Sequence, residues 1–144
     1  MSAARLAIMP ATTLALPRDE MAFRERYRDL LEKRALTTVF RPGNRIFPNW
    51  RGYMEGEIVT ARIIRTPGSD KHGVAPQFHD LRIPIRIVSL ALRPVTLLES
   101  GDFAGSSPDV FDRPSLMNHL YEIYGRSIAS FGNRVTRIGF THAE

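Results

Sequence analysis

The residues best suited to bind a nucleic acid lie in one short stretch, residues 44–56. Arg45 and Arg51 supply planar cations for phosphate groups, and Trp50 and Tyr53 supply ring faces on which an unpaired base can stack. Prolines and glycines interrupt any periodicity, so we predict a structured loop. The alternative is that the rings fill the end of a core while the arginines are solvated, and the usual burial of tryptophan favours this for Trp50.

A second polar stretch contains histidines and carboxylates that could ligate a divalent ion. It comprises Asp70, His72, His79 and Asp80. Their spacing matches no standard metal motif, so we expect a solvated loop and no metal. His119 and His142 have no serine and aspartate partners at a spacing that indicates a Ser-His-Asp site.

Several enzyme classes are excluded by residues or motifs that the sequence lacks. The 144 residues include no cysteine, which excludes thiol catalysis, Cys-ligated zinc, iron–sulfur clusters and disulfides. Neither GxxxxGK[ST] nor GxGxxG occurs, so the phosphate-binding loops of nucleotide hydrolases and dinucleotide-dependent oxidoreductases are missing. We expect no cofactor.

The net charge of +5 favours an anionic partner, nucleic acid first. Residues 33–52 contain five basic residues and no acid, whereas residues 96–125 contain five acids and a single arginine. This distribution predicts a basic face and an acidic face. No apolar run is long enough to span a membrane, and prolines interrupt the apolar N-terminal stretch, so we expect a cytoplasmic protein.

Hydropathy and turn residues predict the elements that position these side chains. Apolar residues at helical spacing predict a helix over 19–34 that Asp19 caps, and β-branched and aromatic residues predict a strand over 36–41. Further strands are predicted over 13–16, 57–65 and 133–142, and one or two strands are predicted within 81–98.

A second helix is delimited by local signals, because Asp112 and Pro114 are typical of a helix start and Gly125 of a helix end. Two helices separated by strand-rich segments predict an α+β fold with a small barrel or curled sheet, not a doubly wound parallel sheet.

Five stretches, in a fixed order, carry a likeness to a known family. They are LLEKRALTTVFR, YMEGEIVTARII, VTLLESGDF, LYEIYG and VTRIGF. Together they resemble the ASCH domain of the PUA-like superfamily over about residues 13–141. The resemblance implies a single domain over residues 1–144, built as a small mixed β-barrel with two principal helices. It also implies a cleft at the first helix–strand junction.

The resemblance further implies a catalytic group of Lys33, Thr38 and Asp109. Thr38 corresponds to the family's threonine, Lys33 or Arg34 would replace its lysine, and Asp109 is the nearest equivalent of the acid that amidohydrolase members use. An ammonium with a lowered pKa could deprotonate the threonine hydroxyl, and a carboxylate could protonate the leaving group. The alternative is structural: a β-forming threonine, a lysine at a helix end and a capping aspartate.

We therefore expect an RNA-binding or RNA-metabolism domain whose basic cleft binds RNA or a nucleoside or nucleotide. The expected contacts are Arg34, Arg41, Arg45, Trp50, Arg51 and Tyr53. One alternative is a hydrolase acting on a modified nucleoside of the N4-acetylcytidine type, or on RNA phosphodiesters. Another is a protein-interaction module that uses the acidic stretch 96–125. No membrane partner is expected, and the oligomeric state is left open.

Overall fold

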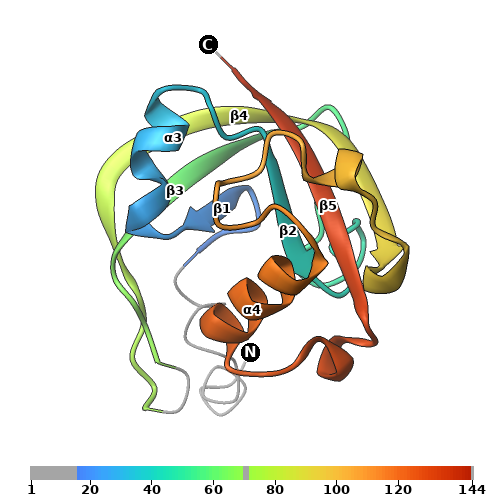
Figure 1. The fold of residues 1–144 in the computed structure, drawn as a ribbon. Helices are drawn as coiled ribbons and strands as arrows, with labels where there is room; N and C mark the ends of the chain where they lie inside the picture. The colour runs from blue at the N-terminus through green and yellow to red at the C-terminus, as the bar shows by residue number, and fades with distance from the viewer. Residues whose placement is uncertain (1–15, 70–71, 144) are drawn as a thin grey trace.

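The structure is a computed structural model that describes residues 16–69 and 72–143, and it is an α+β fold around one curled sheet (Figure 1). The five strands form a half-barrel in the order β1-β3-β4-β5-β2. Their bounds are β1 Glu20–Phe23, β2 Thr38–Pro42, β3 Ile58–Thr66, β4 Gln77–Pro94 and β5 Arg134–His142. β1 runs parallel to β3, and the other neighbouring pairs are antiparallel.

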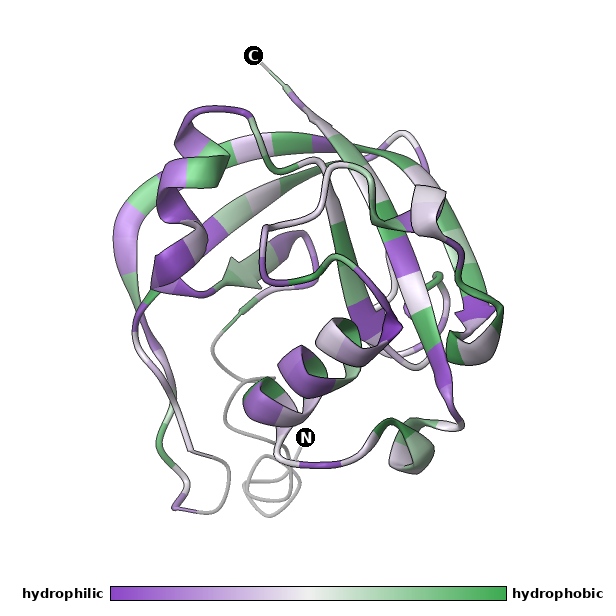
Figure 2. Cartoon of the chain, in the orientation of Figure 1, coloured by the Kyte–Doolittle hydropathy of each residue, from purple (hydrophilic) through white to green (hydrophobic). Residues whose placement is uncertain are grey.

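The predicted strands form because apolar side chains alternate along them and fill the concave side of the sheet. Figure 2 shows this alternation along β4 and β5. In β3, Val59, Ala61 and Ile63 are buried, and in β4 so are Ile85 and Ile87. The strands predicted over 57–65 and 133–142 are confirmed. The 81–98 stretch supplies one strand, which begins earlier than predicted, at Gln77, and ends earlier, at Pro94, because Val95–Leu97 form a 3-10 turn.

The helix predicted over 19–34 is wrong in its first part. Residues Glu20–Phe23 form β1, and only Arg28–Glu32 are α-helical (α3), after the 3-10 turn η1 (Glu25–Tyr27). Asp19 was expected to cap this helix. Its backbone carbonyl instead accepts a hydrogen bond from Thr60 N at 2.9 Å. Pairing with β3 and the burial of Met21 and Phe23 therefore override local helix propensity here.

The second helix, α4, spans Arg113–Tyr124 and confirms the prediction from its end signals. The Asp112 side chain accepts a hydrogen bond from Ser115 N at 2.8 Å, and Gly125 ends the helix with a φ of 67°. Three 3-10 turns complete the chain: η2 (Val95–Leu97), η3 (Ser100–Phe103) and η4 (Ile128–Phe131).

Two apolar clusters hold the fold together. The first fills the half-barrel beneath α3 and includes Met21, Leu31 and Phe140. The second lies between β2, β5 and α4 and includes Phe40 and Leu116. Both clusters contribute walls to a single large cavity. The possible short strand over 13–16 falls, except for Leu16, outside the described residues.

Candidate functional site

The cavity has a volume of about 720 Å³ and lies between the half-barrel and α4. Pockets for small molecules occupy roughly 300–1,000 Å³, so this one is large enough for a nucleotide-sized guest. Its walls come from β1, β2, the loop after β2, the hairpin between β3 and β4, the loop before α4 and α4 itself. The curl of the sheet brings its two edge strands together, so that Arg41 of β2 donates a hydrogen bond to the Ala22 carbonyl of β1.

Positive charge dominates the cavity wall. The described lining residues include five arginines and no aspartate or glutamate, although acids make up 15 of the 144 residues. The five are Arg24, Arg41, Arg45, Arg51 and Arg126. The acid-free stretch that the sequence shows over 33–52 thus supplies three of them from one wall.

The loop after β2 is held by hydrogen bonds that leave its side chains free to face the cavity. The buried hydroxyl of Thr136 accepts from Arg45 N at 2.8 Å and donates to the Gly43 carbonyl at 2.7 Å. Arg45 O accepts from Tyr53 N at 2.8 Å. A Cβ at Gly52 would lie 2.5 Å from a backbone nitrogen, so only glycine fits at this close approach.

Two guanidinium groups lie against the ring of Trp50. The guanidinium carbons of Arg45 and Arg51 are 5.4 Å and 5.5 Å from the ring centroid. Trp50 is 58% exposed, so the interpretation of this ring as core is wrong. Tyr53 is 5% exposed and packs in the first apolar cluster, as that interpretation proposed for the aromatic residues.

Arg41, in β2, is fixed on the same wall. Its Nη2 donates to the Ala22 carbonyl at 2.9 Å, and its guanidinium lies 5.4 Å from the Phe23 ring centroid. Burial lowers the pKa of Arg45, and the positive charges of Arg41 and Arg51 lower it further. The guanidinium groups of Arg45 and Arg51 meet at the Trp50 ring, and Arg41 lines the same cavity. Among the described residues, none of them has a carboxylate within ion-pair distance.

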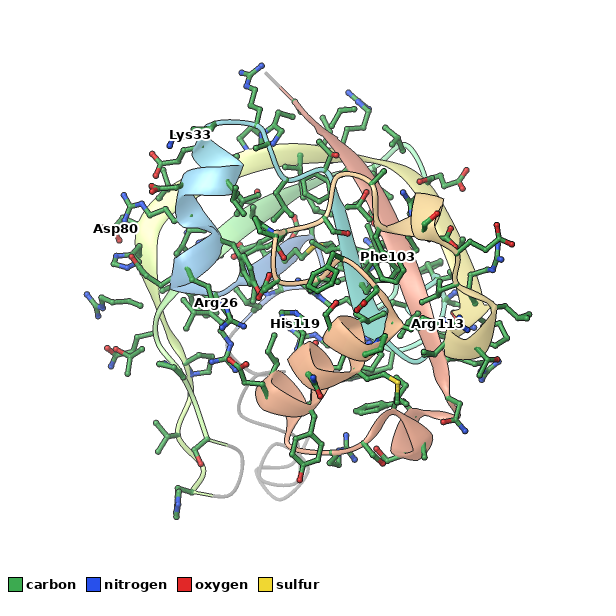
Figure 3. The ribbon with its side chains drawn as sticks, in the orientation of Figure 1. Arg26, Lys33, Asp80, Phe103, Arg113 and His119 are labelled. Carbon is green, nitrogen blue, oxygen red and sulfur yellow. The ribbon has the colours of Figure 1, made fainter. Side chains whose placement is uncertain are left out.

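A hydrogen-bonded polar cluster forms another part of the wall. Tyr27 OH donates to Asp109 Oδ2 at 2.7 Å, and Ser107 Oγ donates to Asp109 Oδ1. His119 Nδ1 lies 3.1 Å from the Tyr27 oxygen. Figure 3 shows Arg26 and His119 approaching each other between η1 and α4, where Arg26 Nη2 is 3.5 Å from His119 Nδ1.

The hydrogen bonds of this cluster set its protonation states. Burial acts to raise the pKa of Asp109, but the hydrogen bonds from Ser107 and Tyr27 outweigh it and the pKa falls below its ordinary value. Burial and the hydrogen bond to Asp109 raise the pKa of Tyr27 to about 12. Burial lowers the pKa of His119. At neutral pH the cluster therefore contains a carboxylate, a neutral phenol and a neutral imidazole.

The contacts also select the tautomer of His119. Tyr27 has one phenolic proton, and Asp109 accepts it in the shorter contact. His119 Nδ1 then faces two acceptors, the Tyr27 oxygen at 3.1 Å and Asp109 Oδ2 at 3.7 Å. The contact with Asp109 is longer than a hydrogen bond, and a proton on Nδ1 can be donated to the Tyr27 oxygen, so we assign Nε2 as the unprotonated nitrogen of the ring. His119 lines the cavity and can accept a proton there.

The structure separates the members of the predicted catalytic group. Thr38 is buried in the cavity wall, where its hydroxyl donates to the Ala104 carbonyl at 2.8 Å. Asp109 contacts three lining residues through the polar cluster. Lys33 is exposed at the end of α3, at the outer edge of the molecule and away from His119 (Figure 3).

The predicted nucleic-acid contacts divide in a similar way. Five of the six line the cavity: Arg41, Arg45, Trp50, Arg51 and Tyr53. Arg34 instead lies beside His142 at a small depression on another part of the surface.

Sequence reasoning missed several lining residues. Tyr27 falls on the apolar face of the predicted helix. In the structure its ring is buried, but its hydroxyl contacts the carboxylate of Asp109, 82 residues later in the sequence. His119 shows no local partner, because Tyr27 lies 92 residues away. For Arg24 and Arg126, the only signal in the sequence was the general excess of arginine.

Within residues 16–69 and 72–143, no group of three metal-ligating side chains converges. The second polar stretch is not a single loop as predicted, because His79 and Asp80 lie in β4. His79 pairs with Glu25, and Asp70 lies outside the described residues. Across the same ranges, every helix falls short of the length and apolar character that a membrane crossing requires.

Comparisons with known proteins identify no family for this chain. No protein-family model matches it, and no curated protein matches it significantly. Among solved structures, it is similar to protein EF3133 from Enterococcus faecalis V583, described as DUF984, with 10% sequence identity and a TM-score of 0.49. The match covers 82% of this chain and 70% of that one. Membership of the ASCH family stays a prediction from the sequence.

Proposed function

We propose that this protein is an RNA-binding or RNA-metabolism domain of the PUA-like type, whose cavity holds one nucleotide of an unpaired strand. The observation that carries the proposal is the five arginines in the described lining, with no acid among them. Cations in a partly desolvated cleft attract an anion more strongly than the same cations in water.

The neighbouring rings make a nucleotide a better guest than a simple anion. Trp50 offers an exposed ring beside two guanidinium groups, so one guest can place a base on the ring and a phosphate on the cations. Hydroxyl groups of Ser106 and Ser107 also line the cavity. The buried Ser106 Oγ has no hydrogen-bond partner among the described residues.

Fluorescence anisotropy with a labelled single-stranded RNA tests this proposal. Arg41→Ala and Arg51→Ala should each weaken binding roughly tenfold or more, because each removes a charged hydrogen bond to phosphate. Arg86→Ala is the matched control, since it removes the same charge from an exposed arginine outside the cavity. Undetectable binding by the wild type, or an equal loss in the control, contradicts a specific role for the cavity.

The polar cluster favours a second candidate function, hydrolysis of the bound guest. His119 Nε2 would take a proton from an attacking water molecule, while Tyr27 and the Asp109 carboxylate stabilise the imidazolium that forms. The substrate would be an amide of a modified nucleoside, such as N4-acetylcytidine, or an RNA phosphodiester. The hydroxyl of Thr38 is committed to a backbone carbonyl, so we assign the central role to His119 in place of Thr38.

Product analysis by chromatography, with melting curves to check folding, distinguishes these roles. Under this second candidate, His119→Asn abolishes turnover while RNA affinity is retained, and Thr38→Val remains active. The opposite pattern indicates that Thr38 is the nucleophile. Wild-type protein that binds RNA but yields no product from either substrate class rules out the second candidate and leaves the first intact.

A further inference from the structure

We propose that the arginine wall of the cavity captures a terminal phosphate monoester, carried by a mononucleotide or by the end of an RNA strand, in preference to an internal phosphodiester. This inference rests on the proposed function and deepens it by naming the part of the nucleic acid that the cavity selects. It follows from the number of guanidinium groups at this wall and from the absence of carboxylate partners for them among the described residues.

Three like charges gather at this wall without compensation. Arg45 and Arg51 contact the same Trp50 ring, Arg41 lines the same cavity, and the charges of Arg41 and Arg51 both act to lower the pKa of Arg45. In the described part of the chain, the guanidinium groups of Arg45 and Arg51 make no ion pair and no hydrogen bond, and their contacts are with the Trp50 ring. Such a cluster is best neutralised by a guest with more than one negative charge.

The backbone around the cluster supports a binding role. Arg51 adopts a left-handed conformation with a φ of 55°, which costs a residue with a Cβ roughly 1–2 kcal/mol. A glycine or asparagine would relieve much of this strain, and neither would place a cation over Trp50. Strain kept at a cavity wall is typical of functional sites.

A monoester fits this wall better than a diester on two counts. Its charge is about −1.5 to −2 at neutral pH, against −1 for an internal phosphodiester, and it offers three free acceptor oxygens against two. Each guanidinium has five N–H donors in a planar fork. Arg41 spends only two of its nitrogens on the Ala22 and Phe40 carbonyls, and donors remain on all three arginines.

The test compares wild-type binding to four versions of one short RNA that carry a label at the end not being varied. The four carry a 5′-phosphate, a 5′-hydroxyl, a 5′-phosphate blocked as its methyl ester, or a 3′-phosphate. We expect at least one free monoester to bind roughly tenfold or more tightly than the hydroxyl end. We expect the methyl ester, which keeps the bulk and removes one charge, to lose most of that advantage.

Arg45→Gln and Arg51→Gln should each abolish the preference, and Arg86→Gln should preserve it. Stronger competition by a nucleoside monophosphate than by inorganic phosphate identifies a nucleotide as the source of the phosphate, and equal competition identifies phosphate alone. Equal affinity for all four RNAs overturns this inference and leaves the proposed RNA binding intact. Undetectable binding of every RNA and of both competitors overturns both.

Discussion

Replacing Arg51 by glycine separates the binding role of this residue from its effect on stability. At a φ of 55°, a residue with a Cβ carries a cost of roughly 1–2 kcal/mol that glycine avoids. Glycine also lowers the free energy of unfolding by about 0.5–1 kcal/mol, because it gives the unfolded chain more conformational freedom. Arg51→Gly should therefore be more stable than Arg51→Ala by about 0.5–1 kcal/mol.

Both variants also lose the contact with the exposed Trp50 ring, which contributes about 0.5–1 kcal/mol. We therefore expect Arg51→Gly to unfold near the wild-type temperature and Arg51→Ala to unfold about 2–3 °C lower. RNA affinity should fall equally in both, by roughly 10- to 100-fold, because both lose the same guanidinium.

Differential scanning calorimetry and RNA anisotropy measure the two effects on the same samples. Arg34→Gly is the matched control, because Arg34 also has a positive φ of 59° but lies outside the cavity. Its RNA affinity should equal that of the wild type. Wild-type affinity in Arg51→Gly would refute the contact with RNA, and equal stability of the glycine and alanine variants would refute the strain at this position.

Three further predictions follow from the packing and protonation of the site. Gly52→Ala should destabilise the fold by about 1–3 kcal/mol and weaken RNA binding, because the added Cβ would meet backbone atoms. Gly101→Ala is the control, since a Cβ there has open space around it, and it should change neither the melting temperature nor the RNA affinity measured by anisotropy. Trp50→Ala should weaken RNA binding roughly 5- to 150-fold with little change in melting temperature, since the ring is exposed. His119→Gln should reduce the loss of stability that thermal melts show on acidification below about pH 6.5. Burial lowers the pKa of His119, so the unfolded chain takes up the proton first and the wild type loses stability there; an unchanged pH profile would contradict this.

The elements that the sequence predicts well are those whose signals are local. The capping residue, proline and glycine that delimit α4 all lie within or beside the helix, so its bounds follow from 14 consecutive residues, 112–125. The prediction for β1 was wrong for the opposite reason, because the deciding contacts are distant in the sequence. Phe23 also fits the apolar face of a helix that continues through Tyr27 and Leu30, and only the parallel pairing with β3, Phe23 with Ile63 included, decides between the two structures.

The same distinction applies to the site. Arg45, Trp50 and Arg51 lie within seven residues of one another, and a loop that short keeps them close together. Tyr27, Asp109 and His119 meet only because α4 and the loop before it fold back over the half-barrel. No spacing in the sequence encodes that contact, and the helix pattern at Tyr27 conceals its hydroxyl.

This difference in origin bears on which function each wall can support. A cationic wall built from one loop can bind an anion even when its side chains shift by an ångström, because charge attraction falls slowly with distance. Proton transfer requires contacts near 3 Å, so a wall assembled from η1, the loop at Asp109 and α4 must be held rigidly. The two hydrogen bonds to Asp109 and the ion pair of Arg26 with Glu122 at 2.9 Å hold it. If the protein only binds its guest, loosening this wall should spare affinity; if it turns the guest over, the same change should abolish turnover first.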